Sequence, residues 1–158
     1  MLQLTKRTEY GLIALTHLAG PAGRAGNVVS AREVAEHYSV PRRLLAEVLK
    51  DLVREGLVES HRGATGGYTL SRPAEQVTLG EVVAALEGRP SIASCESLGA
   101  YGESGCDVEP RCPIRSPIQK IQSSIWAMMQ RTTLRDLADP SLDLDSTGDS
   151  PRPLSTPA

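Results

Sequence analysis

Three cysteines are the residues of this chain whose type and spacing carry the most chemistry. Cys95, Cys106 and Cys112 lie in a Gly-rich segment, 89–112, with the spacing Cys-x10-Cys-x5-Cys. An odd number of cysteines argues against a disulfide framework. Thiolates are soft ligands suited to iron–sulfur clusters and to zinc. The pattern therefore predicts a metal centre, and a purely thiol-based switch or an incidental group of cysteines are the alternatives.

A four-coordinate metal site needs one ligand beyond the three thiolates. The chain has no fourth cysteine, and its three histidines lie in other segments. His17 and His37 fall in predicted helices, and His61 falls in a predicted hairpin. A carboxylate is therefore the remaining candidate for the fourth ligand.

A second group of residues, all basic, is suited to nucleic acid. Arg42 and Arg43 open a predicted helix, and Lys50 and Arg54 follow on it. Residues at the amino terminus of a recognition helix reach base edges in the major groove. Arg62 lies beside a Gly-rich turn, from which it can enter a minor groove. A solvated basic surface is the alternative for each of these side chains.

The net charge of −2 hides a basic amino-terminal part. Residues 1–72 carry +3, residues 73–131 carry −2 and residues 132–158 carry −3. Such asymmetry favours contact between nucleic acid and the amino-terminal part. With four Tyr, one Trp and no Phe, the chain lacks the aromatic platform on which single-stranded nucleic acid stacks.

Size and hydropathy bound the class of protein. The 158 residues, 40% of them apolar, allow one globular domain with an appended tail. No apolar run approaches the roughly 18 residues of a membrane span, and the amino terminus lacks the apolar core of a secretory signal. We therefore expect a cytoplasmic protein without membrane contact.

The elements that must hold these residues are mostly helices. Apolar periodicity predicts a helix over 6–18, with one face formed by Leu12, Leu15, Thr16 and Ala19. Ser30 and Glu33 form a predicted capping box, in which each side chain accepts from the backbone N–H of the other residue. This box begins a short helix over 31–37.

A turn at residues 38–40 separates the short helix from a third one. Pro41 is predicted as the first residue of that helix, which runs to about Glu55 with an inward face of Leu44, Leu45, Val48, Leu49 and Leu52. Two short strand-like runs, 57–60 and 68–70, then flank a Gly-rich turn and predict a hairpin. This order of elements is that of a winged helix-turn-helix, whose partner is double-stranded DNA.

The remaining chain predicts two helices and a tail. A second capping box, at 78–81, begins a helix through Leu86. A long helix over 114–131 carries an apolar stripe of Ile118, Ile121, Ile125, Met128 and Met129. Thr133 begins one more short helix, and residues 139–158, rich in Pro, Ser, Thr and Asp, are predicted to be disordered.

Three stretches of this sequence, followed by the cysteines, resemble a known family. They read Leu4-Thr-Lys-Arg-Thr-Glu-Tyr-Gly-Leu12, Arg62-Gly-Ala-Thr-Gly-Gly-Tyr-Thr-Leu70 and Val77-Thr-Leu-Gly-Glu-Val-Val-Ala-Ala-Leu-Glu-Gly88. Over residues 2–138 the chain is similar to the IscR/NsrR family of bacterial winged-helix transcriptional regulators that bind iron–sulfur clusters.

The resemblance implies a homodimer that binds a palindromic operator. It also implies a 2Fe–2S or 4Fe–4S cluster held by Cys95, Cys106 and Cys112 of one protomer, with a carboxylate from the other. Glu9 stands where NsrR-like members place that acidic ligand. The histidine that IscR-like members place three residues after the last cysteine is Arg115 here. Control of cluster-assembly, iron or redox and nitric-oxide stress genes is the expected role.

The expected fold class is thus mainly α, with four parts. Residues 1–88 form a winged helix-turn-helix with a two-stranded wing, and 89–112 form the cysteine-bearing loop. Residues 113–138 form a long C-terminal dimerisation helix with a short terminal helix, and 139–158 form the tail.

Two other functions stay open. The same DNA-binding fold could respond to zinc or to cysteine oxidation, and a small iron–sulfur electron-transfer protein would carry the cluster without DNA contact. The helix-turn-helix and Gly-rich wing weigh against the electron carrier. No nucleophile, base and orienting group form a recognisable arrangement, so we expect no enzyme.

Overall fold

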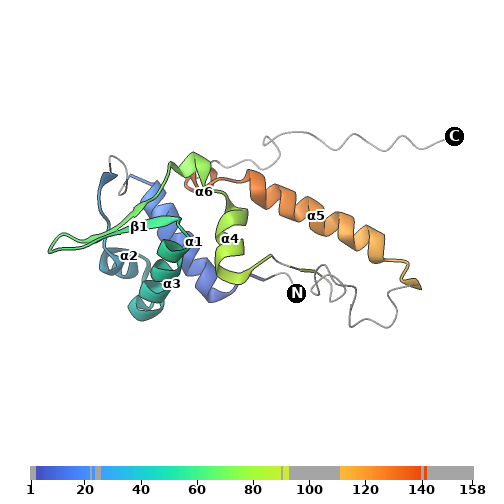
Figure 1. Cartoon of the computed structure of the whole chain (residues 1–158), viewed down its shortest axis with the longest axis horizontal. Helices are drawn as coiled ribbons and strands as arrows, with labels where there is room; N and C mark the ends of the chain where they lie inside the picture. The colour runs from blue at the N-terminus through green and yellow to red at the C-terminus, as the bar shows by residue number, and fades with distance from the viewer. Residues whose placement is uncertain are drawn as a thin grey trace.

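The computed structural model of the chain describes residues 3–21, 23, 26–89, 91–92, 111–139 and 141. The helices are α1 (Lys6–Ala19), α2 (Ala31–Tyr38), α3 (Arg42–Arg54), the 3-10 helix η2 (Ala74–Gln76), α4 (Leu79–Glu87), α5 (Arg115–Arg131) and α6 (Leu134–Leu137). The two strands, β1 (Val58–His61) and β2 (Gly67–Leu70), pair antiparallel. In Figure 1, α1 to α4 and the strands form one body from which α5 projects. The predicted fold class, a mainly α winged helix-turn-helix with a long C-terminal helix, is confirmed.

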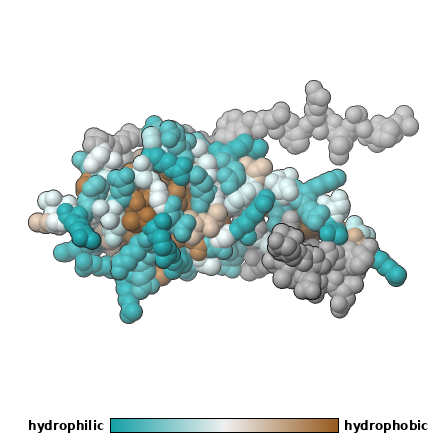
Figure 2. All heavy atoms as spheres, viewed as in Figure 1, coloured by the Kyte–Doolittle hydropathy of each residue, from teal (hydrophilic) through white to brown (hydrophobic). Residues whose placement is uncertain are grey.

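Helix α1 is the centre of the body, because α3, α4, α6 and β2 all contact it. Its buried residues form one cluster with the inward face of α3, which consists of Leu45, Val48, Leu49 and Leu52. That face was expected, and Leu44 packs at its margin. On α1 the expected face divides: Leu15 is buried, whereas Leu12 and Thr16 are half-exposed. Figure 2 shows hydrophobic residues gathered in this body and hydrophilic residues over most of the visible face.

The residues at the helix starts match the predictions at α4 and α6 and differ from them at α2 and α3. The box of Thr78 with Glu81 is complete, and Thr133 forms another with Asp136. At α2 only half of the predicted box forms. The Ser30 hydroxyl accepts from the Glu33 N–H at 3.1 Å, but the Glu33 carboxylate turns away and lies 3.6 Å from His17 Nε2.

Pro41 is the second correction, because it precedes α3 as its N-cap and is not its first residue. Its φ of −61° and ψ of 113° give it extended backbone, and its side chain cannot cap the helix. The first helical residue is therefore Arg42, which places the basic pair in the first turn, as the interpretation requires.

The wing is a short hairpin whose strand β2 is attached, at Tyr68, to the segment before α2. Val58 pairs with Leu70 and His61 with Gly67, one residue longer at the tip than the expected strands. Gly63 in the turn has a φ of 120°, a conformation that side chains with a Cβ rarely adopt. An isolated bridge joins Val29 to Tyr68 through two backbone hydrogen bonds of 2.8 and 3.0 Å. This bridge, which was not predicted, fixes the wing against the body.

Helix α5 presents three faces where one amphipathic stripe was expected. It packs on α4 and buries Gln122 and Met129. On a second face Ile114, Ile121 and Met128 are 61%, 51% and 40% exposed. The third face is polar and consists of Ser116, Gln119, Lys120, Ser123 and Ser124. The neighbouring methionines therefore belong to different faces.

The expected cysteine loop and tail fall mostly outside the described residues. Cys95 and Cys106 lie outside them, as do residues 142–158. Within the described residues, no helix is long and apolar enough to cross a membrane.

Glu81 provides a test of the capping interaction. Partial burial raises the pKa of its carboxyl. The Thr78 N–H and the Arg72 guanidinium, 2.9 Å away, lower that pKa by more than burial raises it, so it lies below the usual value of 4.5. An ionised Glu81 therefore stabilises the fold above about pH 4.5, and this stabilisation is lost as the pH falls through the folded-state pKa.

Glu81→Gln keeps an acceptor for Thr78 but removes the charge that faces Arg72. Because the pair is partly exposed, we expect the free energy of unfolding to fall by no more than about 1 kcal/mol at pH 7. Thermal unfolding of both proteins should show this gap closing as the pH falls below 4.5 and through the folded-state pKa of Glu81. A gap of equal size at pH 7 and at the acid end of the series would contradict the assigned ion pair.

Candidate nucleic-acid interface and thiolate site

The helix-turn-helix holds α3 through a tight turn after α2. Ser39 has a φ of 53° and a ψ of 41°, which lies in the left-handed region that is uncommon for residues other than glycine. The Val40 N–H donates to the Ala35 carbonyl at 3.1 Å and closes the turn. This turn, with the buried face of α3, leaves the first turn of α3 on the surface.

A hollow on this surface brings α2, α3 and the wing together. Arg32 of α2, Arg42 of α3 and Arg62 of the wing turn all line it. These three elements lie at the end of the body opposite to the projecting α5 (Figure 1). Guanidinium groups present several N–H donors in a fixed fork that matches phosphate oxygens and guanine edges. The hollow, which we call the basic hollow, thus has the chemistry of a nucleic-acid contact.

The basic side chains differ in whether a carboxylate already pairs with them. Three of the predicted contacts have no acidic group within 4.0 Å in the described part of the chain, and these are Arg42, Lys50 and Arg62. Arg43 lies 3.4 Å from Glu47, and Arg54 lies 2.6 Å from Asp51. Arg42 and Arg62 are brought together, whereas Arg43 and Lys50 are exposed on α3 outside the lining of the hollow.

Arg32 is the residue that sequence reasoning missed. It occupies the first turn of α2, where its guanidinium also bonds Glu36 at 2.6 Å. The signal was present, since a basic residue lies two positions after the N-cap Ser30. Only the bridge between Val29 and Tyr68, which brings the start of α2 beside the wing, gives that residue its place in the hollow.

The predicted carboxylate ligand, Glu9, lies in the first turn of α1. Its side chain is 36% exposed, and its Oε2 atom is 2.5 Å from Lys6 Nζ. The start of α1 is attached to the end of α4, because Glu87 accepts from the Thr5 N–H at 2.6 Å and from the Thr5 hydroxyl at 2.7 Å. Partial burial raises the pKa of Glu87, but hydrogen bonds from Thr8 and Thr5 outweigh it, so this pKa lies below its usual value. The Glu9 backbone therefore has a fixed position.

Of the predicted thiolates, Cys112 alone lies in the described part of the chain. It is a half-buried free cysteine just before α5. No group of three His, Cys, Asp or Glu side chains converges within the described residues, and Cys95 and Cys106 lie outside them. Of the four predicted ligands, Cys112 and Glu9 lie in the described part of the chain, and the complete ligand set stays a prediction.

The segment that carries the cysteines is held against α5 at its start. The Ile92 N–H donates to Gln122 Oε1 at 2.7 Å. Just before it, the Arg89 guanidinium lies 5.0 Å from the centre of the Trp126 ring, which is a cation–π geometry. Since Cys112 closely precedes α5, both ends of this segment meet the same helix.

Comparison with known protein families matches residues 4–140 to the family Rrf2, described as an iron-dependent transcriptional regulator. Among solved structures, the chain is similar to CymR (YrzC), the global cysteine regulator of B. subtilis, with 26% identity over 87% of this chain and 97% of that chain and a TM-score of 0.67. It is also similar to CymR of Staphylococcus aureus, with 26% identity, coverages of 85% and 97% and a TM-score of 0.65. IscR of T. potens shares 28% identity over 86% of this chain and 85% of that one, with a TM-score of 0.63.

Arg42 provides the test of the basic hollow. Each contact to a base edge contributes about 1–3 kcal/mol, so Arg42→Ala should weaken binding to duplex DNA from the protein's own promoter by about tenfold or more. Fluorescence anisotropy titration measures this affinity. Lys120→Ala is the matched control, because this exposed basic side chain lies on the polar face of α5, outside the hollow. Equal losses of DNA affinity in the two variants would contradict a role of the basic hollow in DNA binding.

Proposed function

The chain belongs to the Rrf2 family of iron-dependent transcriptional regulators, and we propose that it is a homodimer whose binding to a palindromic operator is controlled by an iron–sulfur cluster. The basic hollow carries this proposal. Arg42 and Arg62 line one hollow, so a DNA duplex lying along α3 meets the wing at the same time. Phosphate and base-edge contacts then come from one rigid surface.

Arg42, Lys50 and Arg62, which have no carboxylate partner within the described residues, support the proposed DNA contact. A guanidinium already neutralised by a neighbouring carboxylate releases less counterion on binding a phosphate, so unpaired basic groups contribute most to affinity. Lys50, further along α3, suits a phosphate beyond the first turn. Arg43, paired with Glu47, must exchange that partner for DNA and is the weaker of the two arginines in the first turn.

Dimerisation is supported by the exposed apolar face of α5. Ile114, Ile121 and Met128 are spaced seven residues apart, and the half-buried Ile118 and Ile125 fall between them at alternating spacings of four and three. This is the heptad pattern of helices that pack on other helices. A C2 dimer presents two recognition helices to two half-sites, which is what a palindromic operator requires.

Cys95, Cys106 and Cys112 would hold the cluster, with Glu9 of the partner subunit as the fourth ligand. Cys112 is free and half-buried beside α5, and Glu9 is partly exposed with a surface lysine as its partner. Three thiolates and a carboxylate form a donor set that iron accepts. When bound, the cluster would supply a centre sensitive to oxygen and redox state. The chain's own residues hold both ends of the cysteine segment to α5.

A second candidate keeps the DNA contact and uses the thiols themselves as the signal. The similarity to a global cysteine regulator supports it beside the similarity to IscR. Cys112 is a free, half-buried cysteine, so part of its side chain is accessible to oxidation. The two candidates predict different spectra, since only an iron–sulfur cluster absorbs strongly in the visible range.

Anaerobic purification followed by visible spectroscopy and titration with promoter DNA tests the proposed function. We expect a visible absorption band in the wild type, its loss in Cys112→Ser, and a change of DNA affinity when the cluster is removed. Ser123→Ala on the polar face of α5 is the control, because its side chain is exposed. DNA binding without a visible band, but abolished by oxidation, would favour the thiol-based candidate. No specific DNA binding in any state would contradict both.

Glu9→Gln tests the fourth ligand separately. The three thiolates remain, so we expect a cluster that forms but is lost to chelators several times faster than in the wild type. Absorbance decay after addition of a chelator measures the rate. Lys6→Gln is the matched control, because it removes the surface partner of Glu9 and leaves the carboxylate. If the cluster of Glu9→Gln is lost at the wild-type rate, Glu9 is not a cluster ligand.

A further inference from the structure

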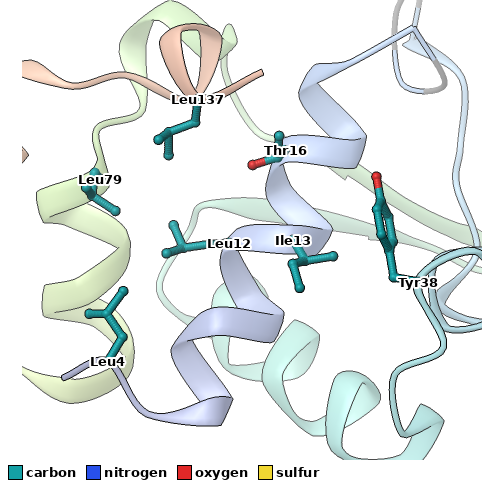
Figure 3. Close-up of a pocket in the computed structure, with 7 residues that line it drawn as sticks. All are labelled: Leu4, Leu12, Ile13, Thr16, Tyr38, Leu79 and Leu137. Carbon is teal, nitrogen blue, oxygen red and sulfur yellow. The ribbon is translucent and has the colours of Figure 1, made fainter. Parts of the chain in front are cut away.

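A polar cluster between α1 and α2 has no part in the proposed DNA contact or in the proposed cluster site. His17, in the last turn of α1, lies against three residues of α2, which are Glu33, His37 and Tyr38. Figure 3 shows Tyr38 beside α1, at the edge of an apolar groove. The cluster therefore joins the central helix of the body to the first helix of the helix-turn-helix.

The His17 ring lies between two polar partners and is only 11% exposed. Its Nδ1 atom is 3.2 Å from the Tyr38 hydroxyl. Its Nε2 atom is buried without a hydrogen-bond partner in the described residues, and it lies 3.6 Å from Glu33 Oε1. When the ring is protonated, both nitrogens donate and the ring carries a positive charge. The protonated ring therefore attracts the Glu33 carboxylate more strongly than the neutral ring does.

Within the described residues, the ionisable groups in contact with His17 are the three of α2. The Glu33 carboxylate favours a protonated ring, and no other described carboxylate lies within 4.0 Å of it. His37 opposes this charge when it is itself protonated, because the two ring centres are 5.4 Å apart. Tyr38 contributes a hydroxyl, which accepts from Nδ1 of the protonated ring. The last turn of α1 also favours a cation, because the carboxyl end of a helix is partially negative.

The Glu33 carboxylate has a second potential partner, which is the backbone N–H of the N-cap Ser30. The two residues have the spacing of a capping box, but only the half formed by the Ser30 hydroxyl is present. At α4 the complete box places the Glu81 carboxylate 2.8 Å from the Thr78 N–H. The same box at α2 would bring the Glu33 carboxylate to Ser30. In the structure this carboxylate faces His17 instead.

The choice between these two partners changes the charge at the basic hollow. Ser30 lines the hollow beside Arg32, whereas Glu33 is not among the residues that line it. A carboxylate at the Ser30 N–H would add a negative charge to the edge of a surface whose arginines attract phosphate. A carboxylate held at His17 leaves the hollow basic.

We propose that His17 is a positioning residue for the DNA surface, because its protonated ring holds the Glu33 carboxylate away from the basic hollow. Loss of the proton weakens this contact, and Glu33 then completes the capping box at Ser30. The inference rests on the proposed DNA contact and adds its dependence on pH. Histidine side chains gain or lose a proton between about pH 5 and 8. DNA binding is therefore tighter at the acidic end of that range.

A double-mutant cycle on the full chain tests this role. It compares the parent protein, His17→Gln, Glu33→Gln and the variant with both changes. Every protein also carries His61→Gln, because His61 lines the hollow and its own titration would contribute. Fluorescence anisotropy measures the dissociation constant for duplex promoter DNA at about pH 6 and about pH 8, at one salt concentration. Circular dichroism checks that each variant is folded.

We expect the parent to bind DNA about two- to fivefold more tightly at the lower pH, which is the effect of one exposed charge pair. His17→Gln should bind at both pH values as weakly as the parent does at the higher pH, because its neutral amide does not hold the carboxylate. Glu33→Gln should bind at both pH values as tightly as the parent does at the lower pH. The double variant should equal Glu33→Gln, since His17 acts only through Glu33.

Glu36→Gln is the matched control for removal of a carboxylate from α2. Glu36 pairs with Arg32 and is not in contact with His17 in the described residues, so this variant should keep the pH dependence of the parent. Loss of the pH dependence in Glu36→Gln would overturn the proposal.

A purely structural role of His17 would give a different pattern. Both single variants would then bind DNA more weakly than the parent, and the double variant would bind more weakly still. That pattern, a pH dependence that persists in His17→Gln, or equal binding by the parent at the two pH values would overturn the proposal and leave the proposed DNA contact intact. No specific DNA binding by the parent at either pH would contradict the proposed function itself, and this inference with it.

Discussion

The close approach of α1 to α3 and α4 at Gly11 is the constraint on which the arrangement of this protein depends. A Cβ atom on residue 11 would lie 2.6 Å from Leu86 Cδ1 and 3.2 Å from Val48 Cγ1. A side chain at residue 11 would therefore require Leu86 and Val48 to shift. Arg7, one turn earlier, forms an ion pair with Asp51 of α3. Together these contacts set the direction of the recognition helix relative to the rest of the body.

Besides the position of α3, two further contacts hold the elements that form the basic hollow. The bridge between Val29 and Tyr68 holds strand β2 of the wing beside the start of α2, and the turn at Ser39 lies between α2 and α3. Arg42 and Arg62 are long and exposed, yet Arg42 belongs to α3 and Arg62 directly follows His61, which pairs with Gly67 in the wing. The surface is thus prepared before DNA arrives, which reduces the entropy lost on binding.

Residues close in sequence were sufficient to predict the helices and strands. Contacts between residues far apart in sequence determined the features that the sequence could not predict. The boxes at Thr78 and Thr133 depend on residues three apart, so spacing was sufficient. At Ser30 the same spacing failed in part, because the Glu33 carboxylate faces His17 of another helix. The apolar residues of α1 and α5 differ in burial because other elements cover some of them and not others. Periodicity alone does not predict which elements those are. For the site, residue types indicated the thiolates and arginines, but the place of Arg32 in the hollow depends on the bridge between Val29 and Tyr68 of the wing.

Helix α5 connects the two parts of the molecule that would carry a signal. Cys112 precedes its first turn, and Ile92 is bonded to Gln122, so the ends of the cysteine segment meet α5 within about 10 Å along its axis. A rearrangement that moves either of these two ends would therefore displace the amino-terminal half of α5. At the other end, near the buried Met129, α5 runs into α6 and so into the body that contains the DNA surface. A rigid helix with attachments at both ends transmits displacement without needing a continuous chain of side-chain rearrangements.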